Sequence, residues 1–515
     1  MVLQGSTDDE QRDAMVPLTV EITPSASALV DSLRGLGYAP ETALADLVDN
    51  SISAEASQIE LDLQWNAGNP IAVVLDDGHG MDYETLVAAM RLGGIGPSAE
   101  RDESDLGRFG LGLKTASLSQ GRRVTVVTRR EGVTSSLSLD VDVIARSGWI
   151  AEVPDPLPDH PFVQRVLTID QGTVVIIDRM DALSGLLGLQ KEAFFLRLEE
   201  IRAHLGMVFH RFIGGDATRV PIVVNGRAVR AWDPFQTSHP ATREMPYERI
   251  RHAGAALTIK PYVLPHRDRF TNDADYEAAG GPGGWGARQG FYVYRGKRLL
   301  VAGSWLGLGG VRTWTRDEAS RLARIAVDLP TGLDRDWRID VRKSQALPPG
   351  ALRARLTAIA GRCRAEAREV FAFRGQGPRL HGAPHTAPAV WLATESPKGI
   401  QYRINRDHPV ILSCREAETG GRRPLNAVLS IIERSVPVER IWLDVSESEG
   451  AEVPELDAND IAQLSDQLYE LGKALPENMT LDQRLDTLLL NLPGDLTKLR
   501  SELMRKLGDN NDGCD

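Results

Sequence analysis

The sequence predicts an α/β protein in which two α/β domains are followed by a mostly helical C-terminal region. Residues 40–54 repeat apolar side chains at helical spacing, as expected of a helix that packs on a sheet. Apolar and polar residues then alternate from Ile59 to Trp65, which is typical of a half-buried strand. Between residues 190 and 372 strand-like runs (220–224, 255–264, 291–301 and 322–329) occur together with helical runs (192–211 and 350–372), which predicts a second α/β domain.

The composition is that of an ordinary globular protein. The chain has 515 residues, of which 42% are hydrophobic and 25% charged, enough for two or three domains. A net charge of −12 argues against a surface that binds nucleic acid everywhere, but it leaves room for a local basic groove. The 3 cysteines are too few for a disulfide framework or a metal cluster.

The sequence does not predict a membrane protein. No apolar run approaches the roughly 20 residues that cross a bilayer. The acidic N-terminal segment also lacks the apolar core of a signal peptide. We therefore expect a cytoplasmic protein without a membrane partner.

Changes in composition and periodicity along the chain predict five parts. They are an N-terminal arm (1–22), a first α/β domain (23–185), a second α/β domain (190–373), a linker (374–388) and a mostly helical C-terminal region (389–515).

The helix predicted over residues 40–54 carries the first chemical signal. Leu44, Leu47 and Val48 belong to its apolar stripe, whereas Asp46 and Asn50 project together from another face. A carboxamide oxygen is a neutral ligand for magnesium, and a carboxylate can accept a proton from water. A solvated helix face would show the same spacing, so this helix alone leaves both interpretations open.

A second polar cluster follows the buried strand predicted over residues 71–75. Asp76 stands at the end of this strand, and Gly78, Gly80 and Met81 follow it. A carboxylate at this place can accept a hydrogen bond from an exocyclic amine such as adenine N6, and the glycines leave room for a flat ring. An ordinary Asp-Gly turn is the alternative.

A glycine-rich stretch leads into the next predicted helix. Its three glycines let the backbone approach a bulky anion that the helix N-terminus also faces. The stretch contains Gly107, Arg108, Gly110, Leu111, Gly112 and Lys114. A flexible turn entering a helix is the alternative. Residues 91–106 precede it without clear periodicity and suit a mobile lid.

Three further strands are predicted, over residues 123–129, 135–142 and 173–178. Thr173 opens the last of them, and its hydroxyl can reach a nucleotide base. Threonine at the start of a strand is also simply a good strand former.

In this order, the four signals resemble the GHKL ATPase superfamily, named for DNA gyrase B, the heat-shock chaperones, histidine kinases and MutL. Residues 45–51 (Ala-Asp-Leu-Val-Asp-Asn-Ser) and 107–114 (Gly-Arg-Phe-Gly-Leu-Gly-Leu-Lys) are similar to its MORC-like branch. The resemblance covers residues 25–180. It implies the Bergerat fold, an α/β (α+β) two-layer sandwich with helices on one face of a mixed sheet and ATP between the helices and a lid.

The resemblance also implies roles for individual residues, with ATP and Mg²⁺ as cofactors. Asn50 becomes the magnesium ligand and Asp76 the adenine reader, with Gly78, Gly80 and Met81 beside the base. The other nucleotide contacts fall on Gly107, Arg108, Gly110, Leu111, Gly112, Lys114 and Thr173.

One position departs from the family pattern. The family usually has a glutamate four residues before the magnesium asparagine, where it serves as the catalytic base, and this chain has Asp46. Aspartate is shorter by one methylene, about 1.5 Å of reach. Its contact with the attacking water is therefore less direct, and hydrolysis is expected to be slow.

In the gyrase and MutL branches a transducer domain follows the ATPase domain and brings a lysine to the γ-phosphate. The resemblance places this role on Lys343, in the basic stretch 337–344 after a predicted strand. A basic surface loop is the alternative.

Two clusters of basic residues make DNA a candidate partner. They contain Arg295, Lys297 and Arg298, and Arg335, Arg338 and Arg342, and together they would form a groove for phosphates. Solvated surface is the alternative. Residues 280–290, rich in glycine around Trp285, are expected to be a flexible loop that contacts a partner.

The resemblance implies an ATP-driven clamp. ATP and magnesium would order the lid, two chains would form a homodimer through their N-terminal domains, and slow hydrolysis would release it. Two alternatives stay open, a non-hydrolysing ATP-dependent scaffold and a histidine-kinase-like phosphotransferase. No phosphoacceptor helix precedes residue 25 to favour the latter.

Overall fold

The computed structural model describes residues 25–35, 37–91, 112–183, 190–215, 219–310, 312–333, 336–339, 346–372, 391–396, 399–409, 411–412, 429, 458–473, 475–476, 479–489 and 496–508. The predicted arm (1–22), most of the predicted lid (92–106) and the linker (374–388) lie outside these ranges. The chain divides into two compact units, residues 1–378 and 379–515.

A mixed seven-stranded sheet forms the first half of the larger unit, in the order β4-β3-β5-β2-β1-β6-β7. Its strands are β1 (Ile59–Gln64), β2 (Ile71–Asp76), β3 (Arg123–Arg130), β4 (Val133–Asp140), β5 (Gly172–Asp178), β6 (Ile222–Val224) and β7 (Arg227–Ala228). All neighbours are antiparallel except β1 and β6, which run parallel. Strands β6 and β7 belong to this sheet although they follow residue 185, the predicted end of the first domain. The limits of the domains stay a prediction.

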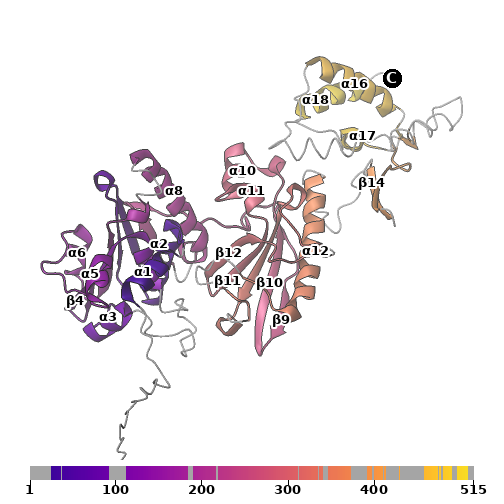
Figure 1. Cartoon of the computed structure of the whole chain (residues 1–515). Helices are drawn as coiled ribbons and strands as arrows, with labels where there is room; N and C mark the ends of the chain where they lie inside the picture. The colour runs from indigo at the N-terminus through magenta and orange to yellow at the C-terminus, as the bar shows by residue number, and fades with distance from the viewer. Residues whose placement is uncertain are drawn as a thin grey trace, which may run out of the picture. The chain divides into compact units, whose positions relative to one another are not determined.

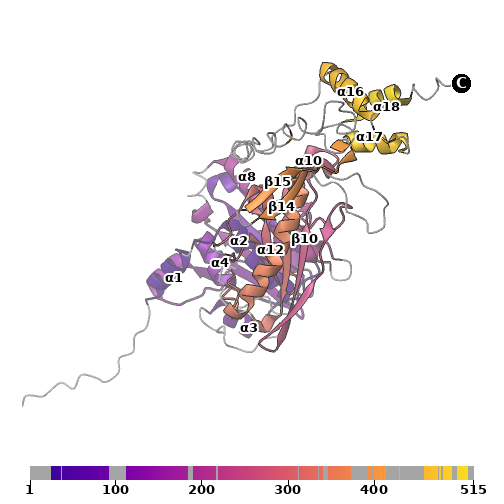
Figure 2. The ribbon, with the colours of Figure 1, turned by 90° about the vertical axis from the view of Figure 1, so that its right-hand side faces the viewer.

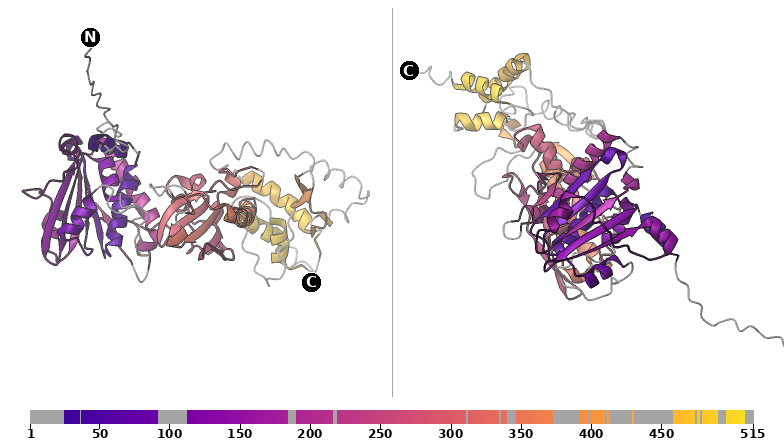
Figure 3. Two further views of the ribbon diagram at one scale, coloured as in Figure 1. Left: turned by 60° about the horizontal axis from the view of Figure 1, so that its bottom comes forward. Right: turned by 90° about the vertical axis from the view of Figure 1, so that its left-hand side faces the viewer.

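Most helices of this half contribute to one large core on a single face of the sheet (Figure 1). They are α1 (Ala26–Arg34), α2 (Pro40–Ser53), α3 (Tyr83–Met90), α4 (Gly112–Gln120), α5 (Val141–Ser147), α8 (Lys191–Val208) and α9 (His210–Ile213). Figure 3 shows the same sheet and helices in indigo and violet from two further sides. The predicted Bergerat-type two-layer sandwich is thereby confirmed.

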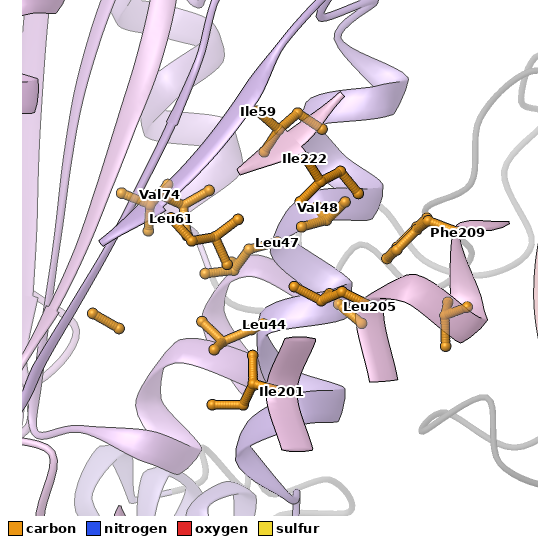
Figure 4. Packing of buried hydrophobic residues seen from close by; sticks show 14 of the residues in the cluster. Leu44, Leu47, Val48, Ile59, Leu61, Val74, Ile201, Leu205, Phe209 and Ile222 are labelled. Atoms are coloured by element: carbon orange, nitrogen blue, oxygen red, sulfur yellow. The ribbon is translucent and has the colours of Figure 1, made fainter. Parts of the chain in front are cut away.

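The apolar stripe of α2 lies at the centre of this core. Leu44, Leu47 and Val48 pack against Leu61 of β1 and Leu205 of α8 (Figure 4). Pro40 occupies the first turn of α2, where its fixed φ suits a helix start. The apolar side of α2 is thus held between the sheet and α8, and Asp46, Asp49 and Asn50 lie on its other side.

The opposite face of the sheet is covered by a short helix, α6 (Pro161–Val166). Val163 and Val166 pack there against alternate residues of the central strands, among them Val73 and Val174. Because side chains alternate across a strand, the apolar runs of β2 and β5 serve both faces. The polar ends of these strands are therefore set in a well-packed frame.

A second mixed sheet with covering helices forms the rest of the larger unit, as expected for a second region of α/β structure. Its order is β12-β11-β13-β10-β8, and β9 also pairs with β10. The strands are β8 (Arg243–Glu244), β9 (Glu248–His252), β10 (Ala255–Val263), β11 (Gly290–Arg295), β12 (Arg298–Ser304) and β13 (Ala323–Leu329). Helix α12 (Gly350–Ala372) packs along β10 and β13 (Figure 2).

Two expectations for this half are wrong. Residues 280–290 are not an open loop, because α10 (Asp273–Gly280) and α11 (Gly284–Ala287) bury Trp285 against Tyr276 with ring centroids 4.7 Å apart. Arg295 and Arg298 do not line a solvent-exposed groove, since they are 7% and 3% exposed. Both segments look polar or flexible in sequence, but tertiary packing buries their large side chains.

Where the structure describes the smaller unit, a hairpin and several helices are present, in agreement with the predicted helical region. Strand β14 (Trp391–Ser396) pairs antiparallel with β15 (Gly399–Ile404). Helices α16 (Ala458–Lys473), α17 (Leu481–Leu489) and α18 (Thr497–Gly508) share an apolar core.

Candidate functional site

Helix α2 carries four polar residues of the candidate site. Asp46, Asp49 and Asn50 lie off its apolar stripe, whereas Ser51, seven residues after Leu44, lies on the side that meets the sheet. Asp46, Asp49 and Ser51 are 3%, 1% and 3% exposed, and Asn50 is partly exposed. Burial of two carboxylates on one short helix is unfavourable unless each has a partner. For Asp49 and Asp46 the second sheet supplies Arg298, whereas Ser51 bonds Asp76 at the end of β2.

Asp76, at the end of β2, is the first of these buried groups. The Ser51 hydroxyl donates to Asp76 Oδ2 at 2.7 Å, and the Gly78 amide donates to Oδ1 at 3.0 Å. Burial raises the pKa of Asp76 to about 6, although both hydrogen bonds act in the opposite direction. Ser51 thus ties α2 to the strand end that carries the predicted adenine reader.

The glycines after Asp76 have a structural reason of their own. A Cβ atom on Gly78 would lie 2.7 Å from the Ala54 carbonyl oxygen, and one on Gly80 would lie 2.0 Å from the Arg129 carbonyl oxygen. Gly80 also has a φ of +63°, in the left-handed region that favours glycine. Glycine is therefore required for the turn to pack on its own chain, in addition to any room it leaves for a ring.

A ladder of hydroxyls continues from Asp76 across the sheet. Asp76 is paired with Thr173 of β5, and Thr173 is paired with Thr128 of β3. The two threonine hydroxyls lie 3.0 Å apart, and the Met81 amide donates to Thr128 Oγ1 at 2.9 Å. The structure therefore brings together Asp76, Gly78, Gly80, Met81 and Thr173 in one turn and ladder.

At the same end of α2, the start of α4 lies beside Asn50. A Cβ atom on Gly112, the first residue of α4, would be 4.0 Å from Asn50 Oδ1. Two residues later, Lys114 is only 2% exposed, and its Nζ donates to the Arg91 carbonyl at 2.6 Å. Burial lowers the pKa of Lys114 to about 8. A helix N-terminus, a buried ammonium and a carboxamide together fit an anion with a bound cation.

Part of the predicted site falls outside the described residues. Gly107, Arg108, Gly110, Leu111 and Lys343 lie outside the described residues. Of the glycine-rich stretch, only Gly112 and Lys114 among the predicted contacts are described. The roles of all these residues stay predictions.

Three residues at the site were missed by the sequence analysis. Ser51 and Thr128 bond directly to predicted site groups, and Arg298 of β12 donates from Nε to both carboxylate oxygens of Asp49 at 2.8 Å. A serine beside the asparagine and a threonine in an apolar strand are weak signals, and strand register alone could identify Thr128. Nothing local in the sequence indicates that Arg298 reaches α2.

The described residues contain no ready-made metal cluster. Within the described ranges, no group of three or more His, Cys, Asp or Glu side chains could hold a metal ion. A magnesium ion on Asn50 would take its other ligands from phosphates and water, as this ion commonly does. In the same ranges, no helix is both long and apolar enough to cross a membrane.

Comparison with known proteins identifies the region that carries this site. Residues 38–173 match the family model described as "Histidine kinase-, DNA gyrase B-, and HSP90-like ATPase". The chain is 35% identical to ATPase MORC2B of Mus musculus over 124 residues, which cover 22% of this chain and 11% of that protein. It is 34% identical to ATPase MORC2 of Homo sapiens over 121 residues, covering 22% and 11%.

A third relative gives the same picture. ATPase morc-1 of Caenorhabditis elegans is 31% identical over 98 residues, which cover 19% of this chain and 11% of that protein. The chain thus spans about a tenth of the length of the curated relatives it matches. The similarity concerns their ATPase region.

Proposed function

We propose that this chain, whose residues 38–173 form a GHKL ATPase domain similar to those of the MORC proteins, is a magnesium-dependent ATPase that works as a nucleotide-gated dimeric clamp. One observation carries the proposal. Asn50 and Ser51 are neighbours on α2. Asn50 lies beside the start of α4, and the Ser51 hydroxyl donates a hydrogen bond to Asp76. A single helical turn thereby links a cradle for phosphates to a reader for a base.

The buried groups fit ATP in charge and in hydrogen-bonding character. Asp76 can accept from the exocyclic amine of adenine, with the Thr173 hydroxyl beside it on the same ladder. Lys114 is a buried cation that donates to the Arg91 carbonyl, and a charged phosphate oxygen would be a stronger partner. Asn50 would hold magnesium, which supplies charge neutralisation at the phosphates when bound.

Asp46 is proposed as the general base that activates water. It lies one helical turn before Asn50 on α2 and is 3% exposed, so bulk water does not screen it. The aspartate is one methylene shorter than the glutamate usual in the family, which favours slow turnover. Lys343 would sense the γ-phosphate from the second half of the larger unit.

We expect Asn50→Ala to lower magnesium-dependent ATP affinity at least tenfold. The substitution removes the proposed metal ligand while leaving the Ser51–Asp76 hydrogen bond in place. Equilibrium binding of ATP with magnesium and with EDTA measures this effect. Affinity in EDTA should change little, and undiminished affinity in magnesium would remove the role of Asn50.

We expect Asp46→Ala to abolish ATP turnover, a loss of at least 100-fold, with ATP binding retained. Typical general-base contributions are about 10²- to 10⁴-fold. Phosphate release under saturating ATP gives the rate, and Asp46→Glu, which restores the family's residue, should be at least as active as the parent chain. Turnover equal to that of the parent in Asp46→Ala would refute the assignment.

The same measurements separate the alternatives. A chain that binds ATP but releases no phosphate would be a non-hydrolysing scaffold. Transfer of the γ-phosphate from radiolabelled ATP to the chain itself would favour a phosphotransferase.

The clamp requires that ATP drive dimerisation. We expect a non-hydrolysable ATP analogue with magnesium to convert monomer to homodimer in analytical ultracentrifugation, and Asn50→Ala to prevent it. DNA is the proposed partner, and duplex DNA should then stabilise the dimer. A sedimentation profile that is the same with and without the ATP analogue would contradict the clamp. The proposed location is the cytoplasm.

A further inference from the structure

An arginine of the second sheet is inserted against the helix that carries the proposed base. Arg298 is the first residue of β12, and its side chain is 4% exposed. Its Nε lies 2.8 Å from both carboxylate oxygens of Asp49, and its Nη2 lies 3.9 Å from Asp46 Oδ1. One guanidinium therefore contacts two carboxylates one turn apart on α2.

The surroundings keep this guanidinium in place. Its Nη1 donates to the Leu299 carbonyl at 2.8 Å, and its carbon lies 5.8 Å from the centre of the Phe209 ring. The planar guanidinium has five donors in a rigid fork, which lysine cannot reproduce. The surroundings of the Arg298 guanidinium thus come from α2, from Phe209 directly after α8, and from β12 itself.

The charged and titratable groups around it come from each packed element. Asp46 and Asp49 belong to α2, His204 belongs to α8, and Arg288 precedes β11. The pKa of His204 is lowered to about 4, first by burial and then by the positive charge of Arg298. His204 is therefore neutral near pH 7, and the charge of Arg298 is balanced by the two carboxylates.

We infer that Arg298 is a positioning residue that makes the action of Asp46 depend on how the second sheet sits against the ATPase domain. The inference rests on the proposed function, in which Asp46 is the base. Arg298 fixes Asp49 closely and reaches Asp46 at the edge of ion-pair distance. A movement of β12 relative to α2 would therefore change the environment of Asp46 before it changed the nucleotide contacts at Asn50 or Asp76.

The loss of Arg298 has a definite electrostatic consequence. Asp49 would remain as a buried carboxylate without this cation, three residues from Asp46. A neighbouring negative charge makes a carboxylate harder to ionise. Asp46 would then be protonated at higher pH and would also lose orientation.

The test compares Arg298→Met with Arg298→Lys, with Arg298→Met/Asp49→Asn and with a control, Arg211→Met. Arg211 pairs with Asp328 of β13 and stacks on Tyr294, so its removal also breaks a contact with the second sheet but does not touch α2. We expect Arg298→Met to lower kcat at least tenfold, with KM and the Kd of a non-hydrolysable ATP analogue within threefold. Arg298→Lys should recover part of kcat.

Two readouts distinguish positioning from a general structural role. The acid limb of the kcat profile should move to higher pH in Arg298→Met and return when Asp49→Asn is added. Hydrogen exchange of α2 amides without nucleotide should accelerate in Arg298→Met but not in Arg211→Met. If Arg298→Met does not fold, Arg298→Lys carries the same comparison with a smaller loss.

The outcomes separate this inference from the proposed function. If Asp46→Ala is inactive and Arg298→Met matches Arg211→Met in kcat, pH profile and exchange, the inference is overturned while the base assignment stands. If Asp46→Ala hydrolyses ATP at the parent rate, the base assignment fails, and the inference fails with it.

Discussion

Asp76→Asn should make the nucleotide-free protein more stable near neutral pH while lowering its affinity for ATP. The pKa of Asp76 is about 6 in the folded protein against an ordinary value of 3.8. Because the folded value is higher, ionisation destabilises the fold progressively as pH rises from about 4 to 6. The two-unit difference corresponds to about 3 kcal/mol at pH 7.5, which the neutral amide avoids.

The same substitution removes the acceptor that Asp76 is proposed to offer to the exocyclic amine of adenine. An asparagine keeps one acceptor oxygen for the Gly78 amide and can donate to Ser51, but it offers a donor where adenine also offers one. We expect ATP affinity to fall about 10- to 100-fold, equivalent to roughly 1.4–2.8 kcal/mol. Thermal unfolding without nucleotide and equilibrium ATP binding at pH 7.5 measure the two opposite effects.

Asp77 supplies the matched control for this prediction. Its carboxylate accepts from the Ser57 and Gln58 amides and from the Ser57 hydroxyl, and these bonds outweigh burial and lower its pKa. Its ionised form therefore stabilises the fold above pH 4, so Asp77→Asn should lower stability and leave ATP affinity unchanged. Equal signs for the two variants in thermal unfolding would contradict the role given to burial at Asp76.

The first half of the fold was largely predictable because its signals are local. The stripe of Leu44, Leu47 and Val48 fixes which side of α2 packs on the sheet, so the side that carries Asp46 and Asn50 follows. Strand β2 and the turn after Asp76 could be found because an apolar run meets glycine and aspartate. Helix α12 also has the predicted limits, 350 and 372, since a continuous helical period spans it.

The rest could not be predicted because it depends on contacts distant in sequence. Thr128 joins the site only through the register of β3 with β5, which no local pattern specifies. Residues 291–301, expected as one strand, form β11 and β12 joined by a tight turn with Gly296 at a φ of +56°. This hairpin brings Arg298 back toward α2, so an arginine that looks like surface charge becomes a buried partner of Asp49.

The affinity for ATP should have a maximum between about pH 6 and pH 8. In the proposed site Asp76 accepts from adenine best when it is ionised, because protonation places a donor hydrogen on one of its two oxygens, and the ionised fraction falls as pH drops through about 6. Lys114 must be protonated to pair with a phosphate, and its charged fraction falls as pH rises through about 8. Each group is only about one-tenth in its binding form one unit beyond its pKa, so affinity should fall about tenfold by pH 5 and by pH 9.

Adenosine and Lys114→Met separate the two limbs of this profile. Adenosine has no phosphate, so its affinity should fall on the acid side and stay level to pH 9. Lys114→Met should bind ATP more weakly throughout and lose the alkaline limb, because no ammonium remains to titrate. ATP binding by the parent chain at pH 8 should also take up protons, since a phosphate beside Lys114 raises its pKa. Calorimetry in buffers of different ionisation enthalpy measures that uptake, and an affinity that is level from pH 5 to pH 9 would show that neither group meets the nucleotide.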